Sequence, residues 1–329
     1  MTFKRRGMTT VLVFSRNSFG PFLRLVLGLV VAALVLLPGL PCLQSAEAAP
    51  SYGAPIERVK TLRDNVTRAR GAEAYTALRL LWQEWDKSDP ILIQEALLGL
   101  SEGPGLSPPA RAYAGLLTAY ALRRRGDLTG SRASIAKLGF IDKWLILGPF
   151  DNEGKGGLLR EDLPERERRD AFENKAYPGK ERAVRYRPLP PAFNNGWVDF
   201  SSLLRPQENL CAFPSTYVSA AQNTPAPRQV SLWAGSSGAL RVYWNGEEVL
   251  RDEKYRALDA DRFATTVTLK PGWNRVLVKV CGDEDAPIFS LRIGKADGSP
   301  DPFLAIDADG AHGSEALPEP ILKGGAEAK

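Results

Sequence analysis

The chain has 329 residues, of which 44% are hydrophobic and 25% charged, and its formal net charge is +5 at pH 7. This composition is typical of about two globular domains and excludes a wholly disordered protein. Residues 1–48 hold five basic residues and one acidic residue, so the rest of the chain is nearly neutral. A neutral chain lacks the positive surface that phosphate-backbone binding requires, and we expect no nucleic-acid partner.

The first 48 residues have the three parts of a secretory signal peptide. A basic start at residues 4–6 precedes an apolar run from Leu25 to Leu37, and the small-residue sequence Ala46-Glu47-Ala48 follows. We expect cleavage after Ala48 and a periplasmic or secreted protein. The run is shorter than the ~20 residues that a membrane-crossing helix needs, so the cleaved chain would have no stable membrane span. The alternative is an inner-membrane anchor through residues 25–41.

Residues 56–139 have helical periodicity and few β-branched clusters. Apolar residues recur every three or four positions, which indicates amphipathic helices. Ser107 precedes Pro108 and Pro109, and we expect its hydroxyl to cap the fourth helix. The helices are predicted at Ile56–Ala69, Ala72–Trp85, Ile91–Leu100, Pro108–Arg125 and Leu128–Lys137.

From residue 140 onward, short extended runs alternate with Gly, Pro and Asn turns, which is typical of an antiparallel sandwich. Asn245-Gly246 tolerates the positive φ angles of a type I′ hairpin turn. The charged segment 160–169 is predicted to be an exposed loop, and residues 299–329 a flexible tail. Strands are predicted at 144–150, Ala183–Arg187, Trp197–Phe200, Leu210–Ser219, Gln229–Ala234, Ala239–Trp244, Arg262–Leu269, Asn274–Cys281 and Ile288–Ile293.

Two segments of this region resemble galactose-binding-like jelly-roll domains. Leu232 to Val249 is similar to that family's Asn-Gly hairpin, and Leu269 to Val280 is similar to the Leu-Lys-x-Gly-x-Asn strand that follows it. Independently of the family, alternating residues of both segments are predicted to face each other across a sandwich core. They are Leu240, Val242 and Trp244 in the first segment and Val276, Val278 and Val280 in the second.

The order of the segments is a second resemblance. The helix pair at 110–137, with its Gly126-Asp127 turn, resembles a tetratricopeptide-type unit, and Trp144 to Gly154 comes next. Such an order is similar to the non-catalytic front part of secreted bacterial helical-repeat proteins with a transglutaminase-like domain. We predict an α+β multidomain protein: a small all-α helical-hairpin domain at 56–139, then an antiparallel β-sandwich of jelly-roll type at 140–298.

Catalytic signals are weak. The one histidine, His312, falls in the predicted tail, whereas a nucleophilic triad or a zinc site needs histidine on a rigid scaffold. No Gly-x-x-x-x-Gly-Lys-Ser/Thr phosphate loop is present. Paired-carboxylate catalysis leaves no signature in sequence spacing, and its candidates are simpler to interpret as solvated acidic turns. These candidates are Asp151, Glu153, Asp283, Glu284 and Asp285.

The same loops supply the predicted binding residues. Asp151 and Glu153 are candidate ligands for a structural calcium ion, which galactose-binding-like domains often carry. A sugar site needs an aromatic face beside polar groups, and most aromatic residues here are expected in the core. Tyr255, in a polar loop, is the preferred contact residue, with Asp283 and Glu284 as polar candidates.

Two cysteines remain if the signal is cleaved, Cys211 and Cys281. An even number in an oxidising compartment predicts a disulfide, and two buried thiols are the alternative.

These features together predict a non-catalytic binding or scaffolding protein of the bacterial cell envelope, with another envelope protein as its partner. The alternative is a carbohydrate-binding accessory protein that uses the sandwich loops to hold a glycan. No cofactor other than the calcium ion is expected.

Overall fold

The computed structural model describes residues 54–166, 175–191 and 195–314. The predicted signal peptide and anchor lie outside these residues. Within the described ranges, no helix is both long enough and apolar enough to cross a membrane. The described helices and sheets belong to one compact unit.

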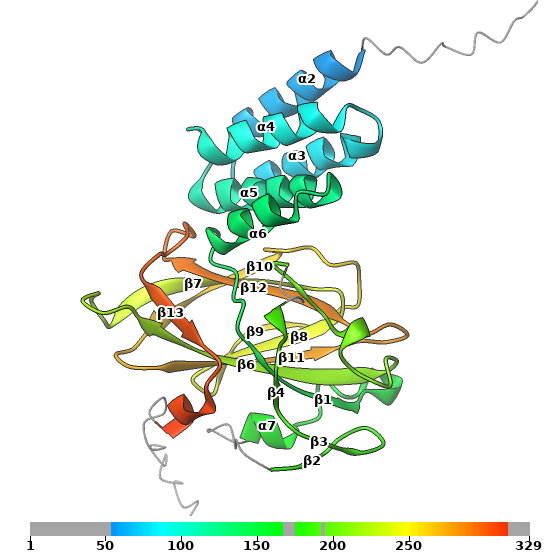
Figure 1. Cartoon of the computed structure of the whole chain (residues 1–329), viewed down its shortest axis with the longest axis vertical. Coiled ribbons are helices and arrows are strands. Elements are labelled where there is room, and N and C mark those ends of the chain that lie inside the picture. The colour runs from blue at the N-terminus through cyan, green and yellow to red at the C-terminus, as the bar shows by residue number, and fades with distance from the viewer. Residues whose placement is uncertain (1–53, 167–174, 192–194, 315–329) are drawn as a thin grey trace, which may run out of the picture. The chain divides into compact units, whose positions relative to one another are not determined.

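Within the described residues, five α-helices precede the strands, as predicted (Figure 1). Asp89 and Asp127 cap α4 and α6, because each carboxylate accepts a backbone N–H of the first turn. The predicted cap at Ser107 is wrong: its side chain makes no cap hydrogen bond, and the two prolines that follow it have no N–H to donate. The helices are α2 (Ala54–Arg68), α3 (Ala72–Gln83), α4 (Pro90–Glu102), α5 (Pro108–Arg124) and α6 (Leu128–Ala136), with a 3-10 turn η1 (Glu84–Asp86) after α3.

The described strands from residue 145 onward build two large antiparallel sheets and one separate strand pair, which confirms the predicted sandwich class. A seven-stranded sheet has the order β4-β1-β6-β11-β8-β9, with β13 also beside β6, and a four-stranded sheet has the order β10-β7-β12-β5. The large sheet contains β1 (Leu145–Asp151), β4 (Arg187–Pro188), β6 (Leu210–Ala220), β8 (Ala239–Trp244), β9 (Glu247–Asp252), β11 (Asn274–Cys281) and β13 (Leu304–Asp307). The small sheet contains β5 (Val198–Asp199), β7 (Arg228–Ser236), β10 (Phe263–Leu269) and β12 (Ile288–Lys295), and a separate pair is β2 (Tyr177–Pro178) with β3 (Ala183–Val184).

The main core contains the alternating residues that the sequence predicted to face inward. All six are buried in one cluster: Leu240, Val242, Trp244, Val276, Val278 and Val280. The prediction that the two segments face each other across the core is wrong, because β8 and β11 are paired neighbours in the large sheet, with Val242 opposite Val278, so both belong to the same wall. The hairpin between β8 and β9 also forms as predicted, because Asn245 and Gly246 both have positive φ angles, 51° and 82°. Residue alternation in these strands therefore determines which side chains fill the core.

The outward face of the large sheet is covered as well. A second hydrophobic cluster there includes Leu147, Phe213 and Leu277, and the 152–166 segment with its short helix α7 (Leu163–Arg166) adds Leu158 to it. The prediction that 160–169 is an exposed loop holds for Arg160 and Glu161 but is wrong at Asp162 and Glu165, whose side chains are only 13% and 3% exposed. Their carboxylates are buried because they pair with Lys279 on β11.

The predicted tail is ordered further than expected. Leu304–Asp307 forms β13, which pairs with the second half of β6, while β1 pairs with the first half. Leu304 and Ile306 pack against the main core, which explains why the chain continues as a strand beyond residue 299. His312 follows in a 3-10 turn, η5 (Gly310–Ser314), and residues 315–329 lie outside the described ranges.

Candidate functional site

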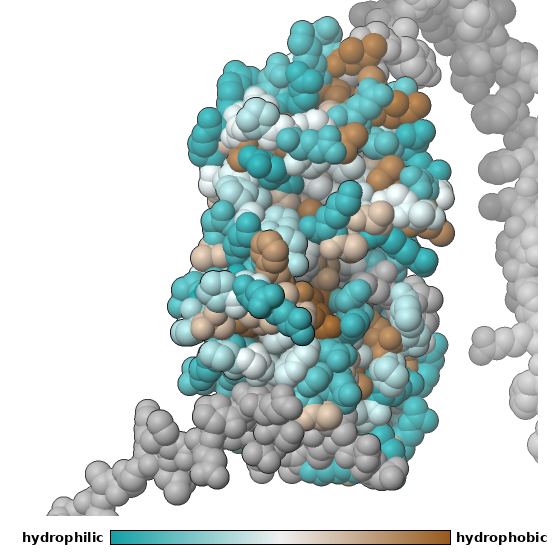
Figure 2. All heavy atoms as spheres, turned by 60° about the vertical axis from the view of Figure 1, so that its left-hand side comes forward, coloured by the Kyte–Doolittle hydropathy of each residue, from teal (hydrophilic) through white to brown (hydrophobic). Residues whose placement is uncertain are grey.

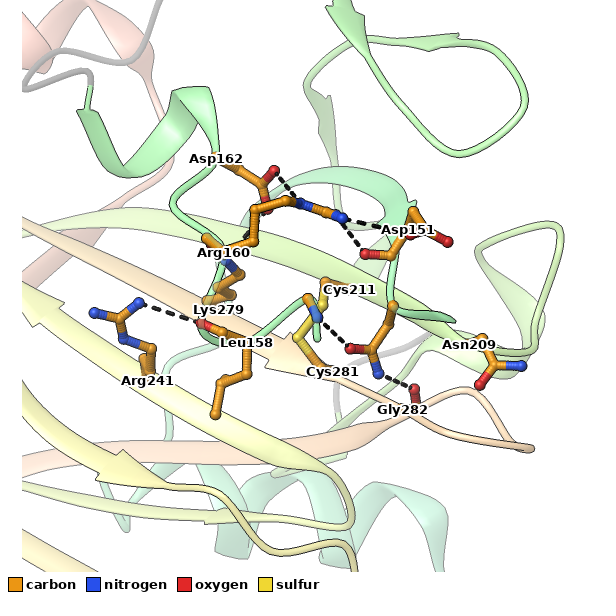
Figure 3. Close-up of a disulfide and its surroundings, with 12 residues drawn as sticks. Asp151, Leu158, Arg160, Asp162, Asn209, Cys211, Arg241, Lys279, Cys281 and Gly282 are labelled. Carbon is orange, nitrogen blue, oxygen red and sulfur yellow. Dashed lines mark hydrogen bonds and ion pairs between the residues drawn. A yellow bond between two sulfur atoms is a disulfide. The ribbon is translucent and has the colours of Figure 1, made fainter. Parts of the chain in front are cut away.

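The predicted disulfide forms between two central strands. Cys211 on β6 and Cys281 on β11 are direct register partners, and the bond joins residues 70 positions apart. Both cysteines are fully buried. Three loops meet beside this bond, at 151–160, 252–256 and 282–285, and we call them the disulfide loop cluster. Figure 3 shows the disulfide with Asp151, Arg160 and Gly282 of this cluster around it. A disulfide of this kind is typical of proteins in oxidising compartments.

Asn152 joins the three loops. Its side chain is fully buried, and its amide nitrogen donates to the Gly282 carbonyl at 2.7 Å and to the Tyr255 hydroxyl at 3.1 Å. Its amide oxygen accepts the N–H of Gly157 at 2.9 Å. A buried amide satisfied on both sides holds its partners firmly, since leaving it unpaired costs about 1–3 kcal/mol. Asn152 was not among the predicted site residues, because the prediction rested on the charged residues beside it.

Lys155 connects two of the predicted ligand residues. Its ammonium lies 2.5 Å from a carboxylate oxygen of Asp283 and 4.8 Å from the centre of the Tyr255 ring. The hydrogen bond to Asp283 raises the pKa of Lys155, with a smaller contribution from Glu284. The structure therefore places Tyr255 and Asp283 against the same lysine, with Glu284 near enough to act on its charge. A ligand role for these three residues stays a prediction.

Asp151 and Glu153, the predicted calcium ligands, lie in the same cluster but contact cations. Lys180 is 2.8 Å from Glu153 and 4.0 Å from Asp151, and Arg160 is 3.4 Å from the Asp151 carboxylate. Figure 3 shows Arg160 between Asp151 and Asp162. Among the residues that the structure describes, no group of three or more His, Cys, Asp or Glu side chains is arranged to hold a metal. The calcium ion stays a prediction.

A buried ionic network lies next to the disulfide, on the outward face of β8 and β11. Lys279 is 2.8 Å from Glu165 and 3.2 Å from Asp162, and its side chain has no exposed surface. Arg241 lies 3.1 Å from Glu165, which also accepts the Tyr243 hydroxyl. Burial and this hydrogen bond raise the pKa of Tyr243. The network anchors the 152–166 segment, and with it one loop of the cluster, to the sheet.

His312 is held more firmly than the sequence predicted. Its Nε2 atom is 3.1 Å from an Asp307 carboxylate oxygen, and its ring stacks on Trp273 with the ring centres 3.9 Å apart. Tyr217 contacts the same ring by its edge. These contacts give His312 a packing role in attaching η5 to the sheet.

A separate hollow of about 1190 Å³ lies between α6, residues 139–144, β4 and β13. Its lining combines apolar residues such as Leu189 and Leu304 with charged residues such as Arg132 and Lys143. Of the predicted site residues, none lines it. Elsewhere, the face drawn in Figure 2 is largely hydrophilic, with hydrophobic residues showing in scattered places.

No family model matches the chain, and no curated protein matches it. Similar solved structures include the PA14 domain of the MpAFP antifreeze protein, with 12% identity and a TM-score of 0.24 over 31% of this chain and 49% of that one. A β-glucosidase from Kluyveromyces marxianus is 17% identical, with a TM-score of 0.26 over 46% of this chain and 14% of that one. An anti-sigma factor domain-containing protein from Clostridium clariflavum is 9% identical, with a TM-score of 0.30 over 51% of this chain and 48% of that one. The chain thus spans about half or less of these proteins' chains, and the galactose-binding-like and tetratricopeptide resemblances stay predictions.

Proposed function

We propose that the chain is an exported, non-catalytic binding protein of the bacterial cell envelope, and that its disulfide loop cluster binds another protein. The disulfide supports export, because such bonds persist in oxidising compartments. The fully satisfied Asn152 and the buried Lys279 network support a rigid site, since they hold the loops in one arrangement.

The position of Lys155 favours a protein partner over a sugar. Its ammonium covers the Tyr255 ring, and the Tyr255 hydroxyl accepts a hydrogen bond from Asn152. A sugar that stacks on this ring would first have to displace the lysine from both the ring and Asp283. A protein surface requires no such displacement, because its own charges can exchange with this half-exposed ion pair, and exposed pairs contribute only about 1 kcal/mol or less.

The same pairing supports the non-catalytic part of the proposal. Asp151, Glu153 and Asp283 each contact a lysine or arginine side chain. Their arrangement suits charge recognition, in which complementary groups select a partner and orient it.

The test compares capture of envelope proteins by the mature chain and by two charge-reversal variants. Lys155→Glu is expected to lose a partner that the unchanged chain retains, because it repels Asp283 and reverses the cluster's charge pattern. Lys270→Glu is the matched control, since Lys270 is an exposed lysine in the turn between β10 and β11. Thermal unfolding of both variants must match that of the unchanged chain.

A glycan array with the same proteins tests the alternative. We expect no glycan signal. Glycan binding that Tyr255→Ala abolishes would establish the carbohydrate-binding alternative instead. Hydrolysis of a cell-wall polysaccharide that is lost in Asp151→Asn or Asp283→Asn would overturn the non-catalytic proposal.

A further inference from the structure

Four aromatic side chains form a continuous strip across the helices and onto the sandwich. The ring centres of Trp85 and Trp82 are 5.1 Å apart, those of Trp82 and Tyr120 are 6.3 Å apart, and those of Tyr120 and Trp197 are 5.0 Å apart. We call these four residues the aromatic strip. Trp82, Tyr120 and Trp197 are each partly exposed, whereas Trp85 is buried, so only part of the strip reaches the surface.

Two neighbouring arginines at the end of α5 lie over this strip. The guanidinium of Arg124 is 4.9 Å from the centre of the Trp82 ring and 5.7 Å from that of Trp85. Arg123 lies 5.2 Å above Trp197 and donates a hydrogen bond to Asn195. A guanidinium that stacks by its face keeps its N–H groups at the edge, where they can bind carboxylates in the bidentate manner typical of arginine.

The positive charge of Arg124 is only weakly compensated within the chain. Its side chain is 49% exposed, and its ionic partner is Asp86, at 3.9 Å, whose side chain is 86% exposed. Such a long, exposed pair is worth little and can be exchanged. The next residue, Arg125, donates to the neutral side chain of Gln94.

The charged side chains around the aromatic strip are mostly positive. Beside Trp85, the buried carboxylate of Glu84 already accepts Arg58 at 2.8 Å and has Lys87 at 4.0 Å. Together with the three consecutive arginines Arg123–Arg125 at the end of α5, these cations outnumber the carboxylates of Glu84 and Asp86. The surface therefore complements a negatively charged partner, in contrast to the mixed charges of the disulfide loop cluster.

We propose that the aromatic strip and Arg123–Arg125 bind an acidic segment of a partner protein. Carboxylates of that segment pair with the guanidinium edges, and its aliphatic groups lie on the exposed parts of the rings. Trp, Tyr and Arg are the residues that contribute most strongly to protein–protein interfaces, and here they occur together. This surface shares no residue with the disulfide loop cluster, so the proposal does not rest on the function assigned there.

The test uses a short poly-glutamate peptide and the mature chain, with binding followed by tryptophan fluorescence. We expect saturable binding that weakens as salt concentration rises, because screening reduces the attraction between exposed charges. The double variant Arg123→Gln/Arg124→Gln is expected to bind at least about tenfold more weakly, since charge-assisted pairs are lost. Arg132→Gln, an exposed arginine of α6, is the matched control and should bind as the unchanged chain does.

Thermal unfolding of the same variants shows whether a loss of binding reflects lost recognition or a damaged fold. Because both arginines are exposed, the double variant is expected to keep the unfolding midpoint within a few degrees. Arg124→Lys tests the guanidinium itself and should bind more weakly than the unchanged chain although the charge is kept. Equal binding by the double variant, or no binding of poly-glutamate at all, would overturn the proposal. Binding of a sulfated polysaccharide in preference to poly-glutamate would overturn it too, because the partner would then be a different class of polymer.

Discussion

Lys279 and Arg292 both lie on outward faces of the sandwich, and neither side chain has exposed surface. Arg292, on β12 of the small sheet, pairs with Asp261 at 2.6 Å and stacks on Trp233. Lys279, on β11 of the large sheet, is surrounded by Asp162, Glu165 and Arg241 side chains that are 3–15% exposed. The first is a closed pair, and the second is a network that reaches the surface.

The difference follows from what covers each face. The helices supply the cover over Arg292: Arg79 of α3 binds Asp259 at 2.6 Å, and the Tyr113 hydroxyl contacts the same carboxylate. Burial raises the pKa of Tyr113 to about 12, so its hydroxyl keeps its proton at neutral pH. Over Lys279 the cover is the irregular 152–166 segment, which brings its own carboxylates. Polar residues on the outward side of a strand therefore indicate a solvent-exposed face only if no further layer packs against that face.

The largest effect is expected for Arg292→Met, which leaves the Asp261 carboxylate buried without its partner. Removing one member of a buried pair costs about 3–5 kcal/mol, and the complete burial here places this variant near the upper end. The free energy of unfolding in urea measures it. Arg292→Met combined with Asp261→Asn should recover much of the loss, because the second change removes the unpaired charge and asparagine tolerates the positive φ of 58° at this position. If the double variant is no more stable than Arg292→Met, the loss comes from the missing attraction between Arg292 and Asp261. It would then not come from the cost of burying an unpaired carboxylate.

The disulfide is expected to matter almost as much. Its two cysteines are 70 residues apart, and a loop of that length corresponds to about 4 kcal/mol of stabilisation. In Cys211→Ala/Cys281→Ala, hydrogen exchange should increase first in the 152–166 segment, because Asn152 and Gly157 lie against this bond. Faster exchange around Arg292 alone would contradict this assignment.

We expect Lys279→Met to lower the free energy of unfolding by about 3 kcal/mol, which is the low end for breaking a buried pair. Arg241 still compensates Glu165 in this variant, whereas nothing replaces Arg292 beside Asp261. The comparison of the two urea curves tests the distinction between the open network and the closed pair. A Lys279 variant less stable than the Arg292 variant would reverse it.

The smallest effect concerns pH at the rim of the network. Hydrogen bonds from Arg251 first and Arg241 next hold the pKa of Glu248 below its usual value. A lowered carboxyl pKa gives stability that is present above the unfolded pKa, near 4.5, and is lost as pH falls through the folded pKa. Because Glu248 is partly exposed, the loss should stay below about 1 kcal/mol. Unfolding of Glu248→Gln should therefore depend less on pH below 4.5 than that of the unchanged chain, and equal dependence would contradict the assignment.

Local patterns predicted much of the architecture. Periodicity located five helices, alternation identified the inward residues of β8 and β11, and the cysteine count led to the Cys211–Cys281 bond. The choice of polar loops also selected Tyr255 and Asp283, which lie together.

What the sequence could not predict depends on contacts between distant segments. The sequence around Glu165 predicts an exposed residue, because its partner Lys279 is 114 residues away and comes beside it only in the folded chain. Asn152 gains its role only when Tyr255 and Gly282 arrive from other loops. Likewise, β13 exists because β6 is longer than β1 and leaves half of one edge to be paired.

The measurement that tests the account most directly is fractionation of the native host, followed by intact-mass analysis of this protein. We predict a species outside the cytoplasm that begins at Ala49 and whose mass is lower than that of its reduced form by the hydrogens lost in the Cys211–Cys281 bond. A membrane-bound species that retains residues 1–48 would instead support the anchored alternative. A cytoplasmic species with both thiols free would contradict export and remove the bond on which the disulfide loop cluster depends.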